Sequence, residues 1–110
     1  MKYISHAEYN SPTRMTETSE LVDRVSKSLG VPPGELVAGG VEMYLRHRLR
    51  AAQAEIHDIQ TRYNVSSPRE LEEKIREGVV EEHPTWETLI QYENLVEQTE
   101  KIRQELDSMR

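Results

Sequence analysis

The chain has 110 residues, of which 35 % are hydrophobic, 5 % aromatic and 31 % charged, and its net charge is −6. A chain so poor in apolar residues builds only a thin core by itself, which favours dimerisation. It has no cysteine, which excludes disulfides and thiolate metal sites. No apolar run approaches the length of a membrane span, and the first residues lack the apolar segment of a signal peptide. We therefore expect a cytoplasmic protein.

The first 17 residues are typical of either a flexible arm or a weak strand. Within residues 3–9, two sets of side chains alternate along the chain, as in a strand, and Pro12 interrupts this pattern. A short first helix is then predicted from Ser19 to Leu29. Thr18 suits its N-cap, and Gly30 suits its end because glycine readily adopts the left-handed conformation.

A long second helix is predicted from about Gly34 to Tyr63, with Asn64 as its stop. Apolar residues repeat along it in steps of four and three, which is a heptad seam. We expect this seam to form the interface of a homodimer, parallel or antiparallel. The alternative is that the seam packs on the last helix of the same chain, as a monomeric bundle. The seam consists of Leu45, Leu49, Ala52, Ile56, Ile59 and Tyr63.

Two further helices complete an all-α prediction. The third runs from Pro68 to Glu77, where Ser67 is the N-cap, Glu70 completes a capping box and Leu71 and Ile75 point inward. The fourth runs from about Pro84 to Ser108, with His83 or Thr85 as its cap. The fold class is thus an all-α, intertwined homodimer in three parts: an arm over 1–17, a dimerising part over 18–64 and a helical tail over 65–110.

Charge separates the two halves of the chain. Residues 1–50 carry seven Lys/Arg and six Asp/Glu, whereas residues 51–110 carry seven and fourteen, a net charge of −7. The second half therefore repels nucleic acid and attracts a basic protein.

The sequence indicates a non-enzymatic protein. The four histidines, at positions 6, 47, 57 and 83, do not have the spacing of metal ligands on one helix face, and no glycine-rich phosphate loop or nucleophile motif is present. Paired glutamates are typical of solvated helices. We expect no catalytic residue, cofactor, metal or small-molecule substrate.

A basic cluster on the second helix has two interpretations. Arg46, Arg48 and Arg50 either flank the seam as a solvated face or contact phosphate groups, together with Arg14 from the first residues. Two-fold symmetry would double the cluster, but the acidic second half opposes DNA binding. DNA contact is therefore a secondary prediction.

Residues 19–49 contain a recognisable pair of helices. A first helix ends in Leu29-Gly30-Val31, Pro32-Pro33-Gly34 forms the turn, Glu35-Leu36 opens a second helix and Tyr44-Leu45 follows within it. These pieces resemble a ribbon-helix-helix domain, whose second helix ends in Tyr-Leu. The resemblance implies a dimer. That family reads DNA with a strand before the first helix, here near Tyr9 to Arg14, where Pro12 and a single basic residue match poorly.

The ribbon-helix-helix family includes many antitoxins of prokaryotic toxin–antitoxin pairs, whose C-terminal helices wrap a small toxin. The resemblance therefore implies an antitoxin-like protein whose acidic tail masks a basic, toxin-like partner, with regulation of its own operon through DNA as a secondary expectation. The candidate partner-binding residues are Trp86, Leu89, Ile90 and Tyr92. The alternative for these residues is packing on the second or third helix, and the alternative function is a structural helical dimer without a DNA role.

Overall fold

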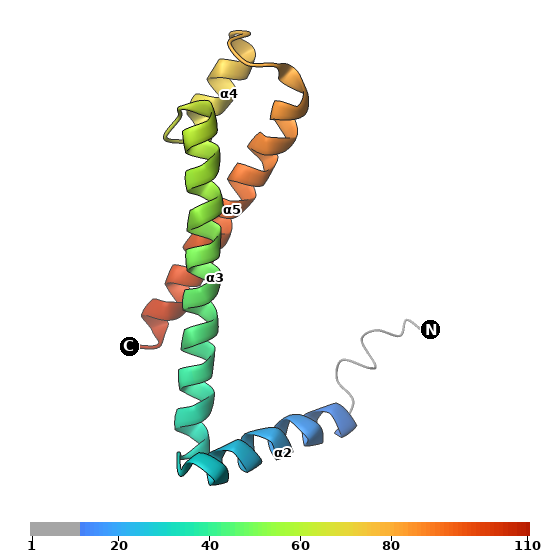
Figure 1. Ribbon diagram of the computed structural model, residues 1–110, viewed down its shortest axis with the longest axis vertical. Helices are drawn as coiled ribbons and strands as arrows, with labels where there is room; N and C mark the ends of the chain where they lie inside the picture. The colour runs from blue at the N-terminus through green and yellow to red at the C-terminus, as the bar shows by residue number, and fades with distance from the viewer. Residues whose placement is uncertain (1–11) are drawn as a thin grey trace. The chain divides into compact units, whose positions relative to one another are not determined.

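The protein is all-α. A computed structural model describes residues 12–110, and over these residues the chain forms helices and no strand (Figure 1). The helices are α2 (Pro12–Leu29), α3 (Pro33–Tyr63), α4 (Pro68–Arg76) and α5 (Glu82–Ser108). The described chain divides into two compact units, one ending at Val41 and the other extending from Glu42 to Arg110. We call these the front unit and the back unit.

Helix α2 starts earlier than the sequence predicts. It begins at Pro12, not near Ser19, so the described part of the predicted strand, from Pro12 to Arg14, is helical. The reason is that proline fits the first turn of a helix, where its missing N–H and fixed φ cost nothing. The proline that interrupts the strand pattern thus opens a helix. The other residues of the predicted arm and strand, 1–11, lie outside the described residues.

Three helices end with the same backbone motif, at the two stops predicted at Gly30 and Asn64 and directly after Glu77, the predicted end of the third helix. Gly30, Asn64 and Gly78 have φ values of 70°, 55° and 77°, in the left-handed region. The next residue is a valine each time, and its N–H donates to the carbonyl five residues earlier at 3.0 Å. This is the Schellman motif, which satisfies carbonyls that the helix end leaves open. Local sequence therefore fixes where α2, α3 and α4 stop.

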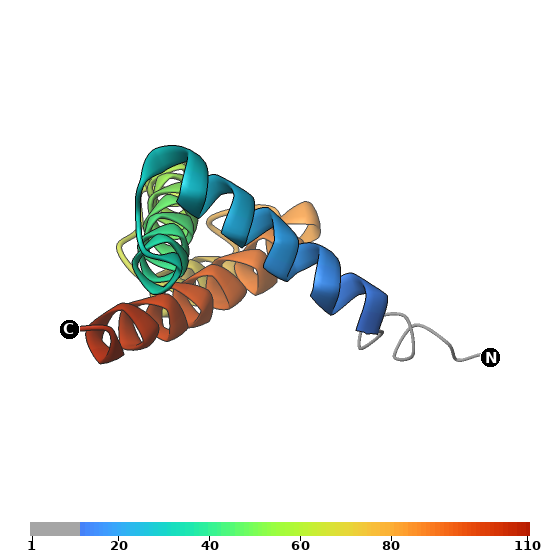
Figure 2. The same cartoon turned by 90° about the horizontal axis from the view of Figure 1, so that it is seen from below.

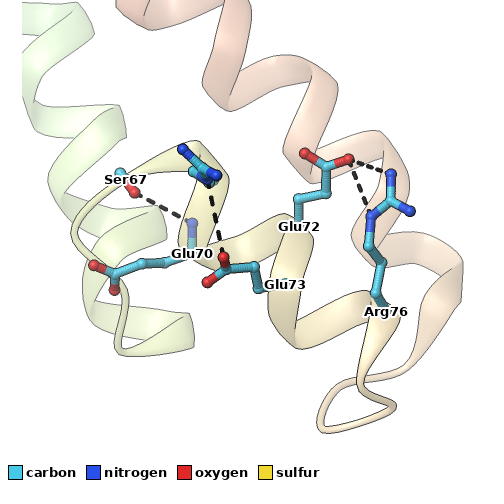
Figure 3. Close-up of polar contacts among 6 residues, drawn as sticks. Ser67, Glu70, Glu72, Glu73 and Arg76 are labelled. Carbon is cyan, nitrogen blue, oxygen red and sulfur yellow. Dashed lines mark hydrogen bonds and ion pairs between the residues drawn. The ribbon is translucent and has the colours of Figure 1, made fainter.

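Helix α4 starts as predicted, with one change in its capping contacts. The Glu70 N–H donates to Ser67 Oγ at 3.2 Å (Figure 3). The Glu70 carboxylate, however, accepts from the backbone N–H and the hydroxyl of Ser66, at 3.1 and 2.8 Å, one residue before the cap. These two hydrogen bonds lower the pKa of Glu70. The Ser67 half of the predicted capping box is thus present, but the Glu70 carboxylate binds Ser66 and not the backbone N–H of the N-cap Ser67.

Helix α5 has an irregular start. Its N-cap is Glu81, whose side chain makes no capping hydrogen bond, and the backbone is non-helical at His83 and Pro84. Regular helix therefore begins after Pro84, close to the predicted start, and the extended backbone of His83 (φ −119°, ψ 124°) is typical of an N-cap residue. Beyond Glu97 the helix continues to Ser108, with Thr99, Ile102 and Leu106 buried.

The back unit contains the core of the described chain. Leu71 and Ile75 of α4 point inward, as the sequence predicts. The ribbons of α3, α4 and α5 lie next to one another in this unit (Figures 1 and 2). Lys74 links α4 to the end of α3, because its ammonium group donates to the carbonyls of Tyr63 and Asn64 at 2.8 and 3.3 Å. The buried core consists of Ala52, Ile59, Val65, Leu71, Ile75, Leu89, Tyr92 and Leu95.

Two glycines lie within α3 close to the boundary between the units. Gly39 and Gly40 lie within the helix, and a side chain at either position would meet no atom within 4 Å. Each costs about 1 kcal/mol of helix stability relative to alanine. Nothing within the described chain requires glycine at these positions.

Candidate protein-binding surfaces

The front unit exposes an apolar surface. Among the described side chains, no apolar residue before Ala52 is buried, and Ser26, which donates a hydrogen bond to the Val31 carbonyl, is the one buried residue of the front unit. Pairing of α2 with the start of α3 therefore does not form a closed core. We call the most exposed apolar residues the front apolar face; they are Leu21 (51 % exposed), Leu29 (67 %), Val37 (47 %) and Val41 (46 %).

Spacing along each helix places these residues in stripes. Leu21, Val25 and Leu29 recur every four residues on α2, and Val37 and Val41 do so on α3. Exposed apolar residues scattered singly need no explanation, whereas several on one helix face mark a candidate interaction surface. The front apolar face is such a candidate.

The predicted seam on α3 is divided. Leu45 and Leu49, near its start, are half-buried. Ala52 and Ile59 belong to the core of the back unit, and Ile56 and Tyr63 pack against that core. The second part of the seam is therefore covered by α4 and α5 of the same chain, which is the alternative that the sequence left open. Pairing of two copies along this seam stays a prediction.

The back unit begins within α3, well before the boundary predicted at residue 65. The reason is the same packing, because Ala52 and Ile59 share a core with Leu89, Tyr92 and Leu95 of α5. A polar contact supports it: the Gln60 side chain donates to the Tyr92 hydroxyl at 3.0 Å. Residues 42–64 are thus part of the tail's fold as well as part of the long helix.

The predicted partner-binding residues separate into three groups. Leu89 and Tyr92 are buried in the core, so they are not accessible to a partner in this structure. Trp86 is partly buried against the same core. Ile90 is 56 % exposed. Of the four, only Ile90 presents most of its side chain to solvent.

Tyr63, at the end of α3, contacts the start of α5. Burial acts to raise the pKa of Tyr63, but hydrogen bonds with Thr85 and Thr88, together with the nearby Arg62 guanidinium, lower it. Arg62 also pairs with Asp58 at 2.9 Å. The Tyr63 hydroxyl is therefore held by neighbours within the chain.

Two of the basic residues predicted to contact DNA already have partners. Arg46 pairs with Glu42 at 2.9 Å, and Arg48 donates to the Tyr44 hydroxyl at 2.9 Å while its guanidinium lies 5.8 Å from that ring's centre. Arg50 is exposed, and Arg14 lies in the first turn of α2. DNA contact by these residues stays a prediction.

Exposed ion pairs partly neutralise α4. Arg76 pairs with Glu72 at 2.6 Å, and Arg69 lies 3.9 Å from Glu73 (Figure 3). Exposed pairs of this kind contribute about 0–1 kcal/mol each. Within the part of the chain that the structure describes, no group of three metal-ligating side chains occurs, and no helix is long and apolar enough to cross a membrane.

A groove lies between α3 and α5 in the back unit. One hollow of about 420 Å³ is lined by Glu55 of α3 and by a face of α5. A second hollow, of about 260 Å³, shares Glu55 and Gln91 with the first and extends to Asp58. The Gln91 side chain donates to Glu55 at 3.2 Å, where the hollows meet. We call both hollows the α3–α5 groove; its α5 wall includes Glu87, Ile90, Gln91, Asn94 and Gln98.

One family model, described as "Uncharacterized protein MJ0235 family", matches residues 15–110. The chain belongs to this family. No curated protein and no solved structure matches the chain. The matched segment of this MJ0235-family chain starts within α2 and includes the whole of α3, α4 and α5.

Sequence reasoning missed most of the groove in this MJ0235-family chain. Glu55, Gln91 and Asn94 have no apolar or motif signal of their own. What could have found the residues of α5 is spacing, because Glu87, Gln91, Asn94 and Gln98 recur at steps of four, three and four, with Ile90 next to Gln91 on the same face. On this α5 face Ile90 is the exposed apolar residue, and Leu95 also lines the groove but is buried.

Proposed function

We propose that this chain is a non-enzymatic, antitoxin-like protein that forms a homodimer through its front unit and binds a basic, toxin-like protein through its back unit. The front apolar face carries the proposal. Leu21, Leu29, Val37 and Val41 remain about half exposed or more. Burying a valine or leucine side chain contributes about 1.5–3 kcal/mol, so a second copy has enough apolar area to gain from.

Charge supports the choice of partner. Residues 51–110 have twice as many acidic as basic side chains, and several Lys/Arg are already paired within the chain, such as Arg62 and Arg76. An acidic surface steers and binds a basic protein. The core of the back unit is complete without that partner, so the unit would bind as a preformed surface.

Charge reversal in the front apolar face tests the dimer. The wild-type chain should sediment at twice its 12.8 kDa mass, and the double variant Val37→Glu/Val41→Glu should sediment at the single mass, because the two carboxylates cannot be desolvated at an apolar interface. Met43→Glu is the control, since Met43 is exposed on the same helix but on another side. A wild-type chain that sediments as a monomer at high concentration would contradict the proposal.

Co-expression tests the antitoxin role. An antitoxin is encoded beside its toxin, so the product of the adjacent small gene should arrest growth when it is expressed alone. Co-expression of this chain should restore growth, and the two proteins should elute together from a sizing column. A neighbour that is harmless, or growth arrest that this chain does not relieve, would leave the structural-dimer alternative.

A further inference from the structure

We propose that the α3–α5 groove is the docking site for a cationic amphipathic helix of the partner, with Ile90 as its apolar contact. This inference rests on the proposed function and assigns its binding surface. It replaces Leu89 and Tyr92, which the core already uses, with a different set of residues on the same helix.

The shape of the groove suits a short helix. Its α5 wall extends from Glu87 to Gln98, so at 1.5 Å per residue it is about 16 Å long, or three helical turns. The opposite wall is α3, at Glu55 and Asp58. Both walls belong to helices that already share a core, so less ordering is needed when a partner helix binds.

The chemistry of the groove selects a cationic partner. Carboxylates of Glu55, Asp58 and Glu87 line its two walls, and the one cation that lines it, Arg62, is paired with Asp58. Glu87 lies 3.0 Å from His83, but both side chains are mostly exposed, which makes this a weak pair. Lysines or arginines of a partner would therefore meet several carboxylates.

Ile90 is the exposed apolar residue on the α5 wall of the groove, where Leu95, the other apolar lining residue of α5, is 9 % exposed. Ile90 is 56 % exposed and lies between Glu87 and the Glu55–Gln91 hydrogen bond along the groove. An apolar residue enclosed by polar neighbours that exclude water is the usual arrangement of a binding hot spot. A helix with an apolar stripe flanked by Lys or Arg would place its stripe against Ile90 and its cations against the carboxylates.

Titration with a synthetic peptide tests the groove on the full chain. The probe is a fluorescent peptide of leucine and lysine at helical spacing, about four turns long, and its control has the same composition in scrambled order. The wild-type chain should bind the probe more tightly than the scrambled peptide. Ile90→Lys should weaken binding about tenfold or more, as expected for a central contact.

Val96→Lys is the matched control. Val96 is also an exposed apolar residue of α5, but it does not line the groove, and its substitution changes the net charge by the same amount. It should weaken binding by less than about twofold, since only long-range attraction changes. Equal losses in the two variants, or no preference over the scrambled peptide, would overturn the docking site.

Glu87→Gln supplies a second test, against Glu105→Gln at an exposed position near the end of α5. The groove variant should weaken binding about threefold and flatten its salt dependence, and the control should not. If Ile90→Lys instead halves the sedimentation mass of the chain, the groove belongs to the dimer and the docking proposal is wrong. The front-face variant Val37→Glu/Val41→Glu should leave peptide binding unchanged, so failure of the dimer and failure of the groove are distinguishable.

Discussion

Replacing Ile59 with aspartate should unfold the back unit. Ile59 is 1 % exposed and lies in the core formed with α4 and α5. A carboxylate there would be desolvated without a cationic partner and would leave the isoleucine contacts empty. We expect a loss of about 4 kcal/mol or more, which is comparable to the whole stability of a small unit. Circular dichroism and urea denaturation would measure it.

Ile90→Asp is the matched control for Ile59→Asp. The chemical change is identical, but Ile90 is mostly exposed, so stability should change by no more than about 0.5 kcal/mol. The pair of variants also separates two uses of the heptad stripe. If Ile59 served a seam between two copies, Ile59→Asp would give a folded monomer, whereas packing on α5 predicts loss of helical structure.

Shortening Leu71 to alanine should destabilise the back unit by about 2–5 kcal/mol. Leu71 is 0 % exposed and, with Ile75, is one of the two buried residues of the nine-residue helix α4. So short a helix is held by its tertiary contacts and caps, because its own hydrogen bonds barely offset the ordering of its backbone. The midpoint of urea denaturation, followed by circular dichroism, would report the loss.

Val79→Ala provides the comparison for Leu71→Ala. Val79 follows the end of α4 and is mostly exposed, so the substitution should cost less than about 0.5 kcal/mol. A similar small effect at Leu71 would mean that α4 does not contribute to the core, and the arrangement of the back unit would then need revision.

Local chemistry explains why the helix ends were predictable. Ser67, Gly30, Asn64 and Gly78 act through their own backbone and nearest neighbours, so their roles can be read without knowledge of the fold. Pro12 shows the limit of that reasoning. Proline suits either the end of a strand or the start of a helix, and here it opens α2.

Tertiary contacts explain what the sequence left open. A stripe such as Ala52, Ile56 and Ile59 has the same spacing whether it packs on a second copy or on its own chain. Only the position of α5 shows that helices of the same chain cover this stripe. For the same reason the sequence does not show which of the adjacent residues Leu89 and Ile90 is buried; in the structure Leu89 is buried and Ile90 is exposed.

This packing changes how the parts of the chain can be separated. Truncation after Val65 would remove α4 and α5 and uncover Ala52, Ile56 and Ile59 at once. The uncovered apolar stripes of two truncated copies would associate with each other, so the truncated chain would not report on the proposed dimer. Point variants such as Val37→Glu/Val41→Glu and Ile90→Lys therefore separate dimerisation from partner binding better than truncation does.

The glycine pair in α3 affects how the two units melt. Gly39 and Gly40 make the helix locally weak next to the boundary at Val41, so cooperativity between the units is expected to be low there. The back unit has its own core, and its melting should not depend on dilution. Under the proposed dimer, the front unit takes its core from a second copy, so mass action would govern its stability. One continuous helix would thus join a part that responds to protein concentration to a part that does not.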